Sequence, residues 1–266
     1  PLATLYYRVY DPDGNLILDD NFGVFFPMLR EPGRFGIAAN KDGLVSIVFR
    51  HRTFATTRMF STFFVKCAGR DIGQRTGSFI LTGPQEVGTA NTDSGLLYSV
   101  TSNWDTDKFV FLYSDEEFLT SRLTKFDSQG SVLATIDVGF YDHAARPMAK
   151  MRDSSEEILL INKSTASLDD LLRVRIFPSD ITLSPTFDST ISCGRVATDQ
   201  SIIGCQFYPS GHMAFAYAAG YPAPSFKVAY LDEAGNHFGD SPLEIATSQG
   251  NGTHPNSKPP QAYGGN

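Results

Sequence analysis

A two-part pattern recurs along this chain and constrains the fold more than any other feature of the sequence. The first part is an apolar strand, a short acidic-glycine turn and a second strand, with clear copies at residues 8–18, 124–134 and 228–238. Each turn opens with an aspartate that can cap its own turn, and a glycine suited to positive φ follows three residues later. The aspartates are Asp11, Asp127 and Asp232, and the glycines are Gly14, Gly130 and Gly235.

Two weaker copies of this hairpin lie between the clear ones, at residues 65–73 and 174–183. The five copies are spaced by roughly 50–60 residues, which is in the range of propeller-type repeats. The first turn, residues 11–15, also resembles part of a calcium loop. A calcium site would need further carboxylates from downstream, but a strand-like segment separates those carboxylates from the turn. A structural turn is therefore the favoured interpretation.

The second part of the pattern is a turn followed by a nearly continuous apolar strand. Runs of about four to six apolar residues, bounded by turns and without alternation, indicate strands buried on both faces. In a propeller, such a run is expected to form the inner strand of a blade. The four runs are at residues 44–49, 109–113, 158–161 and 213–218.

The fifth copy ends at the turn Gly264-Gly265-Asn266, with no apolar strand after it. Two explanations stay open: the sequence is a piece of a longer chain, or a neighbouring subunit donates the strand in a self-assembling particle. We predict a single all-β propeller domain over residues 1–266, of about five four-stranded blades, with one blade incomplete at the chain ends. A β-sandwich array or a solenoid is the alternative. The predicted repeats are roughly 1–51, 52–115, 116–164, 165–220 and 221–266.

The residue pattern of the repeat resembles that of secreted repeat proteins of β-propeller type. The matching residues are Tyr10-Asp11 with Gly14-Asn15, Phe126-Asp127 with Gly130, Leu231-Asp232 with Gly235-Asn236, and Asp42-Gly43. The hallmarks of WD40 and kelch repeats are absent from the sequence. The resemblance is at the level of the fold, implies no catalytic residue, and says little about function, because propellers have many functions.

Charge and hydropathy exclude two classes of partner. The formal net charge is −7, and the sequence has no basic run, whereas a protein that binds nucleic acid normally shows a basic patch. No apolar segment approaches the roughly 20 residues that span a bilayer. We therefore expect neither nucleic-acid binding nor membrane insertion.

The cysteines and the glycosylation sequons favour an extracellular or cell-surface location. Cys193 and Cys205 flank a turn-rich segment of one repeat and are candidates for a disulfide, whereas Cys67 is expected to be a buried thiol. The sequons are at Asn162 and Asn251. No zinc or haem spacing is present, so we expect no metal and no cofactor.

Exposed aromatic residues on loops suggest a binding function. Trp104 is the only tryptophan and stands between Asn103 and Asp105. A sugar ring can stack on such a residue while the neighbouring polar groups bind its hydroxyls; packing between blades is the structural alternative. The second candidate cluster consists of Tyr208, His212 and Tyr221.

Catalysis would require two acids facing each other across a pocket, roughly 5–10 Å apart in glycosidases. The candidate acids Asp42, Asp107, Asp153 and Glu156 precede the apolar strands at equivalent repeat positions, as a turn requirement would also produce. We therefore predict that the chain is not an enzyme. The predicted function is a non-catalytic extracellular module for adhesion or assembly that binds glycan or protein through loops, with a filament or surface-layer subunit as a related version. The alternative is a carbohydrate-active enzyme, a glycoside hydrolase or lyase, with acids in a central funnel.

Overall fold

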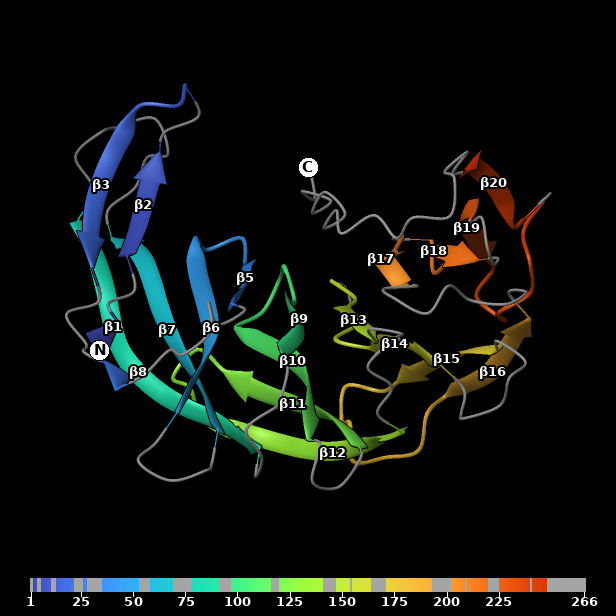
Figure 1. Ribbon diagram of the computed structural model, residues 1–266, viewed down its shortest axis with the longest axis horizontal. Helices are drawn as coiled ribbons and strands as arrows, with labels where there is room; N and C mark the ends of the chain where they lie inside the picture. The colour runs from blue at the N-terminus through green and yellow to red at the C-terminus, as the bar shows by residue number, and fades with distance from the viewer. Residues whose placement is uncertain are drawn as a thin grey trace. The chain divides into compact units, whose positions relative to one another are not determined.

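The computed structural model describes most of the chain between its N-terminus and residue 247, and its elements there are β-strands (Figure 1). The chain divides into two compact units, Pro1–Gly139 and Phe140–Asn266, which are described separately. The single-domain organisation therefore stays a prediction. The described residues are 2–3, 6–10, 13–21, 26–27, 35–52, 58–68, 78–90, 97–115, 120–140, 147–153, 155–163, 171–192, 202–208, 210–219, 225–239 and 241–247.

The first unit contains two four-stranded antiparallel sheets, each with its strands side by side in chain order. One consists of β5 (Phe35–Ala39), β6 (Leu44–Arg52), β7 (Arg58–Ala68) and β8 (Ser78–Ala90). The other consists of β9 (Leu97–Ser102), β10 (Lys108–Asp115), β11 (Thr120–Asp127) and β12 (Val132–Phe140). Two small sheets pair β1 (Leu2–Ala3) with β4 (Phe26–Pro27) and β2 (Tyr6–Tyr10) with β3 (Leu16–Asn21).

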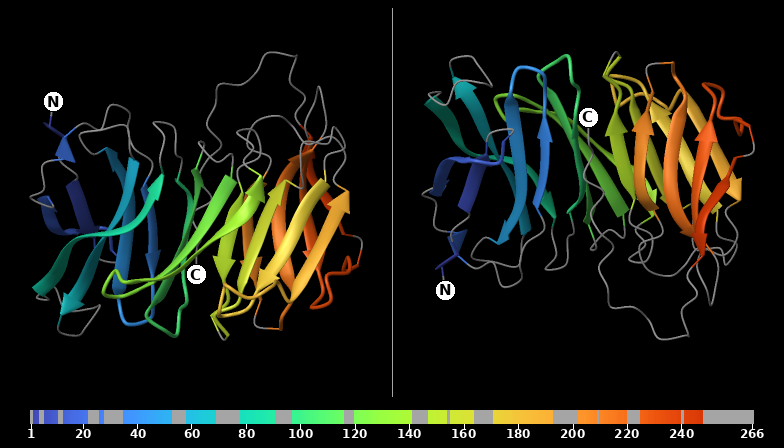
Figure 2. Two further views of the ribbon diagram at one scale, coloured as in Figure 1. Left: turned by 90° about the horizontal axis from the view of Figure 1, so that it is seen from below. Right: turned by 90° about the horizontal axis from the view of Figure 1, so that it is seen from above.

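The second unit repeats this architecture with two further antiparallel sheets, whose strands are seen from two sides in Figure 2. The first consists of β13 (Met148–Met151), β14 (Ile158–Lys163), β15 (Leu171–Phe177) and β16 (Phe187–Ser192). The second consists of β17 (Ile202–Phe207), β18 (Met213–Ala219), β19 (Ser225–Leu231) and β20 (Leu243–Thr247). Four-stranded sheets of this kind are the blades of propellers. The all-β fold class and the fold-level resemblance are thus confirmed, while Gly264–Asn266 lie outside the described residues.

The four apolar runs are buried strands, as predicted, and each is the second strand of its sheet. They form β6, β10, β14 and β18, and each is hydrogen-bonded to a strand on both sides. Side chains on both faces are excluded from solvent, as for Val110 and Phe111 of β10, which have no exposed surface. The first strands were missed because they are short and carry mixed residues, as the alternating burial of β5 and β13 shows.

The aspartate-glycine turns at Asp127 and Asp232 join the third strand of a four-stranded sheet to the fourth, whereas the turn that contains Gly14 lies between the two strands of the β2–β3 sheet. Asp127 Oδ1 accepts hydrogen bonds from the backbone N–H groups of Gln129 (2.9 Å) and Ser131 (2.9 Å), so the aspartate caps its own turn as predicted. Gly130 has the expected positive φ of 78°. Because this turn lies late in the sheet, each four-stranded sheet takes two strands from one sequence repeat and two from the next.

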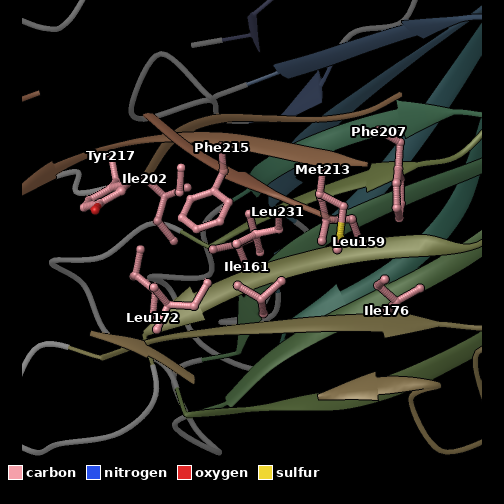
Figure 3. Close-up of a cluster of buried hydrophobic side chains, with 13 residues drawn as sticks. Leu159, Ile161, Leu172, Ile176, Ile202, Phe207, Met213, Phe215, Tyr217 and Leu231 are labelled. Carbon is pink, nitrogen blue, oxygen red and sulfur yellow. The ribbon is translucent and has the colours of Figure 1, made fainter. Parts of the chain in front are cut away.

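Each unit packs its two sheets around its own core. In the first unit the core is rich in aromatic rings: Phe109 stacks on Phe126 with 5.6 Å between centroids, and Phe111 stacks on Tyr113 at 4.9 Å. In the second unit the core is mainly aliphatic, and Figure 3 shows side chains of the two sheets filling the space between them, among them Ile161 and Phe215. Burial of these side chains supplies the main favourable term for folding.

Candidate functional site

The turn between β9 and β10 presents the only tryptophan of the chain to solvent. Trp104 is 52% exposed, whereas its neighbour Asn103 is 1% exposed. The difference follows from the roles of the two side chains. Asn103 Oδ1 points into the turn and accepts the backbone N–H groups of Asp105 (2.7 Å) and Thr106 (2.9 Å).

The turn between β5 and β6 is built in the same way in the neighbouring sheet. Asn40 is 4% exposed, and its Oδ1 accepts the backbone N–H groups of Asp42 and Leu44, both at 3.1 Å. The sequence shows this equivalence as a repeated Asn-x-Asp, at residues 40–42 and 103–105. Sequence analysis missed residues 40 and 41 as part of the site, and this short repeat is the signal that could have found them.

Three hydrogen bonds to backbone carbonyl groups join the two turns. The backbone N–H of Lys41 donates to the carbonyl oxygen of Trp104 (3.0 Å), and Asn40 Nδ2 donates to the carbonyl oxygen of Thr106 (2.9 Å). Ser102 Oγ donates to the carbonyl oxygen of Ala39 (2.6 Å). The backbone that carries Trp104 is therefore held in place from both sheets. We call residues 40–43 and 103–107 together the Trp104 platform.

Charged side chains flank the platform in pairs. Lys41 Nζ lies 3.1 Å from Asp105 Oδ1, and Lys108 Nζ lies 2.9 Å from Asp107 Oδ1. Ser128 Oγ, from the β11–β12 turn, donates to Asp107 Oδ2 (3.1 Å). The hydrogen bond from Lys108 is the largest cause that lowers the pKa of Asp107; burial opposes it, and the hydrogen bond from Ser128 adds to the lowering. Asp107 is therefore ionised at neutral pH and below.

The candidate acids lie in the turns between first and second strands. Asp42 and Asp107 are exposed in the β5–β6 and β9–β10 turns, which the bonds above bring together. Asp153 and Glu156 are in the β13–β14 turn of the second unit, where Glu156 has an unusual positive φ of 56°. Among the described residues, no three His, Cys, Asp or Glu side chains form a group able to bind a metal ion.

The second candidate cluster is partly described. Tyr208 is 41% exposed next to the β17–β18 turn, and His212 Nδ1 lies 2.7 Å from Ser210 Oγ. The His212 ring meets Phe238 edge to face, with 5.2 Å between centroids, and Phe238 is 60% exposed. Sequence analysis had not included Phe238, whose turn is distant in sequence. Tyr221 lies outside the described residues.

The predicted modification sites have different environments. Asn162 on β14 is 6% exposed, and its Oδ1 accepts a hydrogen bond from Arg175 (3.0 Å), so burial argues against a glycan there. Asn251 and Cys193 lie outside the described residues. Cys205 on β17 forms no disulfide with any described residue, and because Cys193 is not among these residues the predicted disulfide stays a prediction. Among the residues that the structure describes, no helix has the length and hydrophobicity to cross a bilayer.

Comparisons with known proteins give similarity only at the level of solved structures. No family model matches the chain, and neither does any curated protein. A eukaryotic initiation factor is 13% identical with a TM-score of 0.42, over 92% of this chain and 62% of that one. A GH43 β-1,3-galactosidase is 12% identical with a TM-score of 0.46, over 90% of this chain and 49% of that one. An α-L-arabinofuranosidase from Podospora anserina is 11% identical with a TM-score of 0.37, over 78% and 73% of the two chains.

Two of these structures are glycosidases, and this finding contradicts the prediction that the chain is not an enzyme. That prediction is withdrawn. It rested on the absence of a recognisable catalytic motif, and acids that act from separate turns of a β-sheet protein form no motif along the sequence.

Proposed function

We propose that this chain is a carbohydrate-active protein that binds a glycan at the Trp104 platform. The observation that carries the proposal is the half-exposed position of the only tryptophan, on a turn whose backbone is fixed by hydrogen bonds from a neighbouring sheet. A large aromatic ring that stays half exposed at a rigid turn contributes less to a core than a fully buried ring. It offers an apolar face on which a pyranose ring can stack.

The neighbouring groups suit the polar part of a sugar. Asp105 and Lys41 are each about half exposed, at 50% and 48%, and offer carboxylate acceptors and an ammonium donor to hydroxyl groups. Because the two turns are already joined, little backbone order has to be gained on binding. Preorganisation of this kind lowers the entropic cost of association.

The proposal places the protein at the cell surface or outside the cell, where polysaccharides are available as ligands. The support for this location is the proposed glycan binding at the Trp104 platform, and not the predicted disulfide or the sequons. Detection of the protein in the washed cell-surface or medium fraction of its source would support this location, and its confinement to the cytosolic fraction would refute it.

The binding proposal is tested by screening the purified chain on a glycan array and measuring the affinity for hits by calorimetry. We expect Trp104→Ala to weaken binding at least about tenfold, which corresponds to about 1.4 kcal/mol, and Trp104→Phe to retain part of the affinity. Tyr10→Ala is the control, because Tyr10 is equally exposed at 53% but lies on β2. Absence of any hit, or equal affinity of Trp104→Ala, would refute the proposal.

Hydrolysis of the bound glycan is the second candidate function. Asp105 and Asp107 lie in the same turn as Trp104, and Asp107, held ionised, suits a nucleophile or a general base rather than a general acid. Incubation of array hits with the protein, followed by chromatography of the products, tests this candidate. Product release that Asp107→Asn abolishes without loss of binding would support hydrolysis; intact glycan after long incubation would exclude it for that substrate.

A further inference from the structure

We infer that the Trp104 platform selects uncharged glycans over glycans that carry carboxylate or sulfate groups. The inference rests on the proposed function and names the class of ligand for the same site. It follows from the number of charges around the tryptophan and from how they are paired.

Acidic side chains outnumber basic ones on the two turns and the residue that follows them. The acids are Asp42, Asp105 and Asp107, and the bases are Lys41 and Lys108. All three acids are exposed, and the carboxylates of Asp105 and Asp107 are both 50% exposed. A ligand on the tryptophan face therefore meets a net negative surface.

Both lysines already have an acidic partner. Lys41 is 3.1 Å from Asp105 and Lys108 is 2.9 Å from Asp107, so an anionic ligand would have to displace one of these carboxylates to gain a cation. The displaced carboxylate would then face a like charge. Exposed ion pairs are individually weak, but like charges placed together oppose binding and exclude wrong partners.

The repulsion should persist over a wide range of pH. Lys108 and Ser128 lower the pKa of Asp107, so that this carboxylate stays charged in mildly acid solution. A uronic acid or a sulfate ester is also ionised there. By contrast, the hydroxyl groups of a neutral sugar can donate hydrogen bonds to the carboxylates and accept hydrogen bonds from the ammonium groups.

The test uses an array printed with neutral, uronic-acid and sulfated oligosaccharides, followed by calorimetry with the strongest neutral hit and its carboxymethylated derivative. We expect the hits to be neutral and carboxymethylation to weaken binding at least about tenfold. The affinity for the neutral hit should change little with salt. Preferential binding of acidic oligosaccharides, with affinity that falls as salt rises, would overturn the inference.

Charge-neutralising variants give a readout that misfolding would not produce. Asp105→Asn and Asp42→Asn should raise the affinity for the carboxymethylated derivative relative to the neutral hit, whereas Asp13→Asn, on the exposed β2–β3 turn, should leave this ratio unchanged. An unchanged ratio in both platform variants would refute the inference. If no oligosaccharide of any class binds, the proposed function itself fails, which is a distinct result.

Discussion

Asn103 shows how a buried polar side chain fixes an exposed functional one. Its Oδ1 satisfies two backbone N–H groups of the turn, and the side chain itself is only 1% exposed. Without this acceptor two part-buried backbone donors lose their partner, and a buried donor left unsatisfied costs about 1–3 kcal/mol. The position of Trp104 thus depends on the residue before it.

We expect Asn103→Ala to lower the free energy of unfolding by about 1–3 kcal/mol, as measured by urea denaturation. Gln129→Ala is the control, since Gln129 is an exposed turn residue, and should change stability by less than about 0.5 kcal/mol. Equal stability of the two variants would contradict the role assigned to Asn103.

Cys205 provides a second test at the scale of the residue. Burial of the sulfur in β17 raises the pKa of this thiol to about 12. Because only the thiolate reacts with alkylating agents, native protein should label very slowly at Cys205 at pH 7, and at about pH 9 labelling should still be far slower than in the unfolded protein. Mass spectrometry of the Cys205 peptide, with urea-unfolded protein as the reference, measures this. Rapid native labelling at pH 7 would contradict the burial of the thiol.

At the scale of the element, the aspartate-glycine turn between β19 and β20 is held by two constraints. Gly235 has a φ of 81°, and a Cβ added there would overlap the ring of Phe187 on the neighbouring sheet. Gly239, in the same unit, has a φ of 62° but nothing within 4 Å of an added Cβ. The two glycines therefore separate backbone strain from steric overlap.

We expect Gly235→Ala to lower the free energy of unfolding by about 2–5 kcal/mol, and Gly239→Ala by about 1–2 kcal/mol. The left-handed conformation costs about 1–2 kcal/mol without glycine, and overpacking adds about 1–3 kcal/mol. Thermal denaturation of both variants measures the difference. The same loss in both would mean that Phe187 does not limit this turn.

The sequence predicted the elements that have strong local signals. Turns such as that at Asp127 need a specific residue at a specific φ, and runs such as residues 109–113 are apolar because both faces of β10 are covered. The first strands were not predictable in this way. β5 and β13 alternate in burial and are short, so their composition resembles that of loops.

Cross-strand ion pairs on the outer hairpins also escaped prediction. Arg122 lies 3.1 Å from Asp137, and Arg173 Nε lies 2.7 Å from Asp188 in the equivalent hairpin of the second unit. The residues of each pair are far apart in the sequence, on either side of a turn of different length in each copy. Their register, and hence their contact, depends on the folded sheet.

The candidate site was only partly visible in the sequence for a similar reason. Trp104 was identified because it is unique, but Lys41 and Asn40 join it through bonds between two sheets. Such contacts depend on how the first strands lie next to each other. For the whole molecule, the net charge of −7 keeps nucleic-acid binding disfavoured, and assembly through a donated strand stays a prediction.

A single tryptophan makes the emission of the whole molecule a report on one site. The most direct measurement is therefore intrinsic fluorescence during titration with a neutral glycan found on the array, with acrylamide quenching before and after saturation. Stacking of a sugar on Trp104 should shift the emission to the blue and protect the indole from acrylamide, with a midpoint equal to the calorimetric Kd. Saturable binding with unchanged emission and unchanged quenching would contradict the assignment of the glycan to the Trp104 platform.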